Sequence, residues 1–180
     1  MGSSKGEAVD APASSTAAAT ALARLRAGET LGASELAEWL TIDADRFATG
    51  TLGLRWDRIS LSEVAGHLDI DERHRQPYGI VHGGVWCAVV ESLASVAAAL
   101  QVADSGRVVV GVSNSTDFLR SHREGRVEAV ATPVHVGRSQ QVWQVWLTRS
   151  EDGKAIARGQ VRLANIAPAT VGAHPEGTAG

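Results

Sequence analysis

The chain has 180 residues, 44% of them hydrophobic and 21% charged, so it is long enough for one domain with a substantial core but not for two. Its 17 Lys and Arg residues against 20 Asp and Glu give a net charge of -3, which argues against a broad nucleic-acid-binding surface. The single cysteine, Cys87, excludes an intrachain disulfide and a cysteine-rich metal centre, and it fits a reducing compartment.

The N-terminal part of the chain is poor in large apolar residues. Residues 1–20 are mainly Ala, Ser, Gly and Pro, which bury too little surface to offset ordering, so they predict a disordered tail. No secretory signal is visible there, and we expect a cytoplasmic protein. Residues 21–45 carry two short helical patterns, at residues 21–26 and, after a cap at Ser34, at residues 35–40. They predict a short helical N-terminal extension.

The folded domain is expected at residues 46–167, followed by a loose C-terminal tail at residues 168–180. Partly alternating apolar and polar residues predict six strands. These are residues 52–59, 64–70, 108–120, 125–136, 141–149 and 155–166. Turn residues connect the last four strands, including Arg123-Glu-Gly125 after the first of them, so consecutive antiparallel hairpins are expected. A long helix from Gly83 to about Gly106 can cover one face of this sheet, which predicts an α+β fold.

The long helix is apolar enough to raise the question of a membrane span. Glu91 lies near its middle, which would cost about 2.5–3.5 kcal/mol in a bilayer, and the segment is rich in Ala, Gly and Ser rather than Leu. We therefore expect a helix buried within the protein and no membrane partner.

Glu91 is also the one charged residue between Gly83 and Leu100. Such a carboxylate either faces water along a narrow stripe or is held in a partly dry site for its chemistry. Gly83, Cys87, Glu91 and Ser95 recur every four residues and so share one side of the helix. Because the flanking residues are small, they predict a groove in which the carboxylate can act as a general base.

The start of the same helix offers a second chemical group. Its first backbone N–H groups, at His82-Gly83-Gly84, have no intrahelical partner and favour a developing oxyanion. Gly83 and Glu91 are eight residues apart and therefore about 12 Å apart along the helix axis. They cannot serve one carbonyl within one chain, so joint action requires a dimer with antiparallel helices.

The segment Gln76-Pro-Tyr-Gly-Ile-Val-His-Gly-Gly84, followed by Glu91 and Ser95, resembles the active-site motif of hotdog-fold acyl-CoA thioesterases. It is similar to 4-hydroxybenzoyl-CoA thioesterases of the Gln/Glu type and to phenylacetate-pathway and dihydroxynaphthoyl-CoA relatives, from about Leu52 to Ile166. The resemblance implies a hotdog fold, in which an antiparallel sheet wraps a long helix. It also implies homodimers, or homotetramers built from two dimers, with sites at the subunit interface.

By position, the resemblance makes Glu91 the catalytic carboxylate, either as nucleophile or as base towards water. It assigns the Gly83 N–H to polarising the thioester carbonyl, with Gln76 assisting nearby. Ser95 corresponds to a hydroxyl residue that positions the acid or the water, and His82 shapes the loop.

For the CoA part of the substrate, the resemblance implies contacts from Arg120 and from the turn at Arg138-Ser139. It implies no metal or organic cofactor, because CoA belongs to the substrate.

The expected function is hydrolysis of acyl-CoA thioesters to free acid and CoA, with aromatic acyl groups slightly preferred. A hotdog module that binds acyl-CoA or lipid without turnover remains an alternative, as does an enoyl-thioester hydratase. A metal site at His67, Asp69 and Asp71 with His74 is a weaker alternative, because a polar outer face of a strand explains these residues as well.

Overall fold

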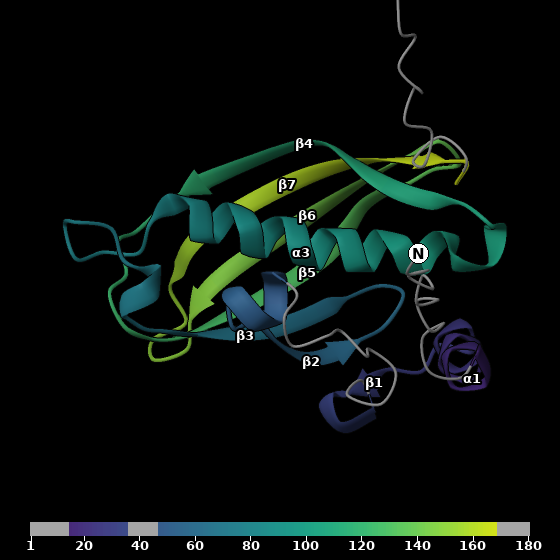
Figure 1. Ribbon diagram of the computed structural model, residues 1–180, viewed down its shortest axis with the longest axis horizontal. Coiled ribbons are helices and arrows are strands. Elements are labelled where there is room, and N and C mark those ends of the chain that lie inside the picture. The colour runs from purple at the N-terminus through teal and green to yellow at the C-terminus, as the bar shows by residue number, and fades with distance from the viewer. Residues whose placement is uncertain (1–14, 36–46, 169–180) are drawn as a thin grey trace, which may run out of the picture.

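The computed structural model describes residues 15–35 and 47–168, in which a seven-stranded antiparallel sheet curls around one long helix (Figure 1). The strands are β1 (Leu31–Gly32), β2 (Arg55–Ile59), β3 (Val64–Ile70), β4 (Val108–Phe118), β5 (Gly125–Val136), β6 (Gln140–Arg149) and β7 (Ala155–Ile166). The helices are α1 (Ser15–Arg26) and α3 (Gly83–Val102), with short turns η1 (Phe47–Thr51), η2 (Glu72–His74) and η3 (Ala103–Ser105). The α+β architecture and the six predicted strands are confirmed, and only the two-residue β1 has no counterpart among the predictions.

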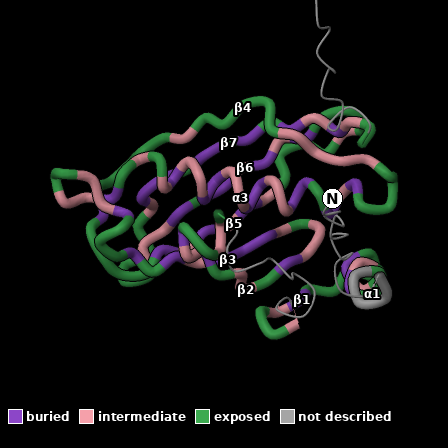
Figure 2. The backbone as a smooth tube through the Cα atoms, viewed as in Figure 1, coloured by how far each residue is buried: buried purple, intermediate pink, exposed green. Residues whose placement is uncertain are grey.

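Helix α3 is apolar because it forms the centre of the core. Its buried residues face the sheet, where Ala129, Val145 and Leu163 are also buried, and Figure 2 shows this buried layer running along α3 and the central strands. Gly159 on β7 permits the close approach, since a Cβ there would lie 2.5 Å from the Val90 side chain. The segment Gly83–Ser105 contains an 18-residue stretch with the length and hydropathy of a membrane span, with a mean hydropathy of 1.7, but half of that stretch is buried inside the protein. Its hydropathy is thus that of a core helix.

The connection between β4 and β5 departs from the sequence prediction. The sheet order is β1-β2-β3-β5-β6-β7-β4, so β4 lies at an edge beside β7, from Val108 opposite Ile166 to Phe118 opposite Ala157. The predicted hairpin at Arg123–Gly125 is therefore wrong, because β5 pairs with β3 on one side and with β6 on the other. Instead, residues 119–124 cross the sheet at the start of α3.

The N-terminal extension packs at the other end of α3. Helix α1 begins at Ser15, so residues 15–20, assigned above to the disordered tail, are helical. Arg26 at the end of α1 donates to the carbonyl of Leu100 (3.1 Å) and pairs with Asp104 (2.9 Å). The first contact supplies a hydrogen-bond donor to a carbonyl in the last turn of α3. The predicted tail at residues 1–14, most of the second predicted helix and the C-terminal tail beyond Pro168 lie outside the described residues.

Candidate active site

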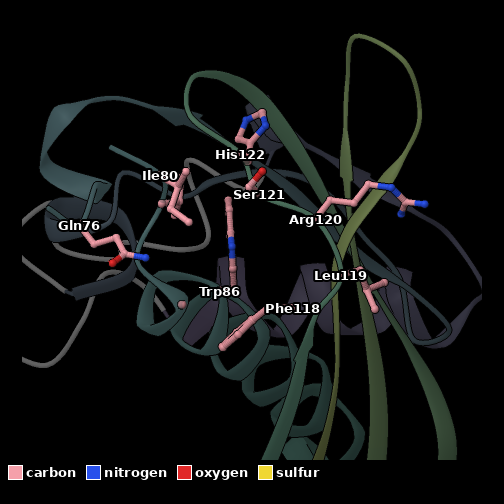
Figure 3. Close-up of a pocket in the computed structure, with 10 residues that line it drawn as sticks. Gln76, Ile80, Trp86, Phe118, Leu119, Arg120, Ser121 and His122 are labelled. Atoms are coloured by element: carbon pink, nitrogen blue, oxygen red, sulfur yellow. The ribbon is translucent and has the colours of Figure 1, made fainter. Parts of the chain in front are cut away.

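A pocket of about 320 Å³ opens at the start of α3, between the segment that precedes the helix and the crossover that follows β4 (Figure 3). We call it the α3 N-terminal pocket. Its lining consists of Gln76, Ile80, Val81, Gly83, Trp86, Phe118, Leu119, Arg120, Ser121 and His122. The fold thus brings together three of the residues singled out in the sequence, Gln76, Gly83 and Arg120, which lie up to 44 positions apart in the chain.

One backbone donor of α3 remains free in this pocket. His82 is the N-cap, and its Nδ1 accepts the Gly84 N–H at 2.9 Å, while the Val85 N–H donates to the His82 carbonyl at 2.9 Å. Among the described residues, no acceptor meets the Gly83 N–H. Phe118 packs against Gly83 so closely that a Cβ at position 83 would lie 2.7 Å from its ring. Residue 83 therefore presents its N–H at the positive end of the helix and has no room for a side chain.

Gln76 is held by a tight turn that precedes α3. Its N–H donates to the Ile80 carbonyl, and its own carbonyl accepts from the Gly79 N–H, both at 2.8 Å. Gly79 has a φ of +75°, a conformation that favours glycine. Within the described part of the chain, the Gln76 side-chain amide makes no hydrogen bond, so it is available to a molecule in the pocket.

The buried side chain of His74 anchors this turn to the domain. Its Nε2 lies 2.9 Å from the Leu52 carbonyl, and its Nδ1 accepts the Asp71 N–H at 3.0 Å. His67 instead bonds Asp57, and the described residues contain no group of three His, Cys, Asp or Glu side chains that could hold a metal. Asp69 pairs with Arg126 and Asp71 with Arg73, so the four residues of the alternative metal site make other contacts.

Glu91 lies two turns further along α3 and does not line the pocket. Its half-buried carboxylate faces β4: Ser95 Oγ donates to Oε1 at 3.4 Å, and Asn114 Nδ2 donates to Oε2 at 3.1 Å. The role that the resemblance implies for Ser95 stays a prediction. The distance between Glu91 and Gly83 means that one chain holds the two groups in separate places.

Two residues around Glu91 went unrecognised in the sequence. Asn114 donates to the carboxylate, and Gly111 leaves room for it, because a Cβ at position 111 would lie 2.7 Å from Oε1. A glycine inside a strand pattern is a signal of close approach by another group. Nothing local to Asn114 indicates its partner, because that depends on how β4 packs against α3.

The residues expected to bind CoA do not come together in one chain. Arg120 lies in the α3 N-terminal pocket, where its Nη1 donates to the Ala155 carbonyl at 2.6 Å. The Arg138-Ser139 turn lies at the far end of α3, and Arg138 lines a hollow of about 400 Å³ there together with Val102. The Ser139 carbonyl accepts the Asn165 N–H at 2.9 Å, which holds this turn in place.

The inner wall of the pocket combines an indole and an imidazole. Trp86 is 3% exposed and His122 is 5% exposed, and their ring centroids lie 6.3 Å apart. Burial lowers the pKa of His122 below its usual value of 6.5, because desolvation penalises the charged imidazolium. The wall is therefore aromatic and uncharged at neutral pH.

Comparison with known proteins gives a consistent family. Residues 78–156 match the family described as the thioesterase superfamily. A Mycobacterium tuberculosis protein described as a candidate esterase is 45% identical over 117 residues, which cover 64% of this chain and 83% of the relative. The 1,4-dihydroxy-2-naphthoyl-CoA hydrolase of Escherichia coli is 38% identical over 96 residues, which cover 53% of this chain and 70% of that protein. A crystal structure of a thioesterase from Haemophilus influenzae superposes with a TM-score of 0.67 at 30% identity, covering 77% of this chain and 93% of that one.

Proposed function

This chain belongs to the thioesterase superfamily, with its hotdog fold, and we propose that it hydrolyses acyl-CoA thioesters to a carboxylic acid and free CoA. The observation that carries this proposal is that, among the described residues, the α3 N-terminal pocket contains both a free backbone donor, the Gly83 N–H, and an unpaired side-chain donor, the Gln76 amide. Both can donate to the oxygen of a thioester carbonyl, whose negative charge grows as the tetrahedral intermediate forms. The amides would thus lower the barrier to attack on that carbonyl.

The attacking group in this proposal is Glu91 of the partner subunit. Its carboxylate either attacks the carbonyl carbon, forming a mixed anhydride as the C–S bond breaks, or takes a proton from a water that attacks that carbon. In both routes CoA leaves as the thiolate, and in the first a water then hydrolyses the anhydride to the free acid and the Glu91 carboxylate. Single turnover in water enriched in heavy oxygen separates the two routes. Label in the Glu91 carboxylate marks covalent attack, and so does a trapped acyl-enzyme. Label in the product acid with no trappable acyl-enzyme marks water activation.

The dimer is supported by the edge strand β4. This strand has 11 residues, and among the described strands β7 is its one sheet neighbour, which leaves its outer edge to pair with a second copy. Val112 and Phe118 on β4 are also exposed apolar residues. Antiparallel pairing of two β4 strands about a two-fold axis would set the two α3 helices antiparallel, and Glu91 of each would then face the partner's Gly83.

The same pairing would complete the proposed CoA site. Since Arg120 lies at the start of α3 and Arg138 at its end, the partner's Arg138 would approach the pocket that contains Arg120. The Arg138 guanidinium makes no hydrogen bond or ion pair within the described residues. Arg120 uses Nη1 on the Ala155 carbonyl, so its remaining donors and the Arg138 guanidinium of the other protomer can hold the phosphates of CoA.

For the acyl group, the rings of Trp86 and Phe118 and the uncharged His122 line the pocket (Figure 3). Stacking on such rings favours flat acyl groups, so aromatic acyl-CoA is the proposed preference.

A panel of aromatic and aliphatic CoA thioesters, with a free-thiol reagent as readout, tests the function. We expect thiol release by the wild type and by Glu151→Ala, a control on an exposed turn, but its loss in Glu91→Ala. Tight binding without thiol release from any ester would instead indicate a binding module. An enoyl-CoA is added to the panel and followed by the ultraviolet absorbance of its conjugated thioester, and loss of that absorbance without thiol release would indicate a hydratase.

A further inference from the structure

Asn114 reaches from β4 across to α3 and contacts Glu91 there. Its Nδ2 donates one hydrogen to Glu91 Oε2 at 3.1 Å and one to the carbonyl of Cys87, one helical turn earlier, at 3.0 Å. Both amide hydrogens are therefore used, and both fix the strand to the face of α3 that carries the carboxylate.

A third contact fixes which way the Asn114 amide points. Thr116, two residues along the same face of β4, donates its hydroxyl to Asn114 Oδ1 at 2.7 Å. A flipped amide would place Oδ1 against the Glu91 carboxylate and the Cys87 carbonyl, which are both acceptors. The series of hydrogen bonds from Thr116 through Asn114 to Glu91 thus favours one orientation of the Asn114 amide.

The two carboxylate oxygens of Glu91 consequently differ. Oε2 has a well-formed bond from Asn114, whereas Oε1 has only the 3.4 Å contact from Ser95 among the described residues and lies against Gly111, whose missing side chain leaves room for it. We propose that Asn114 is a positioning residue that holds Oε2 and so directs Oε1 at the thioester bound by the partner subunit. This inference depends on the proposed function, because it takes Glu91 as the attacking group.

The chemistry of the amide suits this task. Asparagine orients the carboxylate through neutral hydrogen bonds, whereas an arginine or lysine at position 114 would neutralise the charge that attack or proton removal requires. The geometry also matters, since a displacement of about 1 Å in a reacting group can reduce the rate about 100-fold.

The test compares three single variants on β4 with the wild-type dimer. Asn114→Ala should lower kcat about 10- to 100-fold and leave KM within about 2-fold, because substrate binds to other residues. Thr116→Val, which removes only the hydroxyl behind Asn114, should lower kcat by a smaller factor. Ser115→Ala is the matched control: Ser115 lines a separate polar hollow with Asp117 and Arg158, and this variant should keep wild-type kcat.

The variant Asn114→Asp supplies a readout that a purely structural role would not change. It places a second carboxylate beside Glu91, and two adjacent carboxylates do not both ionise readily, so the acidic limb of the kcat profile should move to higher pH. An unchanged kcat in Asn114→Ala, or an unmoved acidic limb in an active Asn114→Asp, would overturn the inference.

Failure of the underlying function has a different signature. If Glu91→Gln keeps wild-type activity, Glu91 is not the attacking group and both proposals fail. If Glu91→Gln is inactive while Asn114→Ala keeps wild-type kcat at the same dimer content, only the positioning role is wrong.

Discussion

Gly111 on β4 lies directly against the Glu91 carboxylate, so that a Cβ at position 111 would come within 2.7 Å of Oε1. Gly111→Ala should therefore displace the carboxylate and lower kcat about 10- to 100-fold, with little change in KM. Gly32→Ala is a matched control, since a Cβ there would meet nothing nearer than 3.9 Å. Wild-type kcat in Gly111→Ala would show that the position of Oε1 does not limit the reaction.

The His82 cap should contribute to stability as well as to the shape of the site. His82→Ala removes the acceptor of the Gly84 N–H, and loss of an N-cap typically costs about 0.5–2 kcal/mol. We expect a lower urea midpoint than in His135→Ala, which replaces another exposed histidine. Equal midpoints for the two variants would mean that the cap does not stabilise α3.

The pKa of His122 predicts how stability depends on pH. Because burial lowers that pKa in the folded state, the unfolded chain takes up a proton below about pH 6.5 while the folded chain stays neutral. The contribution of neutral His122 to the free energy of unfolding is therefore complete above about pH 6.5. It is lost as the pH falls from there through the lowered pKa of the folded state. His122→Gln should therefore show a smaller fall in Tm between about pH 7.5 and 5.5 than the wild type. A larger or equal fall would contradict a buried neutral imidazole.

The proposed CoA contacts can be separated from catalysis with a truncated substrate. Arg138→Ala should raise KM for acyl-CoA about 10-fold, the typical effect of losing one charge-assisted hydrogen bond, and should leave KM for the matching N-acetylcysteamine thioester unchanged. Arg162→Ala, an exposed arginine on β7, serves as the control. Equal increases in KM for acyl-CoA and for the truncated thioester would show that Arg138 does not recognise the nucleotide end of CoA.

Local patterns were sufficient to predict most helices and strands. They also singled out Glu91 and Gly83 as site candidates, because a lone acid and a glycine helix start stand out in an apolar segment. What they missed depends on the crossover at residues 119–124, which moves β4 to the far edge of the sheet. That placement brings Asn114 and Gly111 against α3. A glycine inside a strand pattern signals a close approach at position 111, but no local pattern indicates which group approaches it or Asn114. The helical start at Ser15 was missed for a similar reason, since α1 is anchored through the contacts of Arg26 with the end of α3.

The most direct measurement concerns the division of one site between two chains. Glu91→Ala and Gln76→Ala are each expected to be inactive as homodimers. A heterodimer of the two, isolated by separate tags, would contain one doubly altered site and one intact site if each site takes Gln76 from one protomer and Glu91 from the other. About half of the wild-type thioesterase activity is the expected result. A heterodimer as inactive as its parents would contradict the shared site.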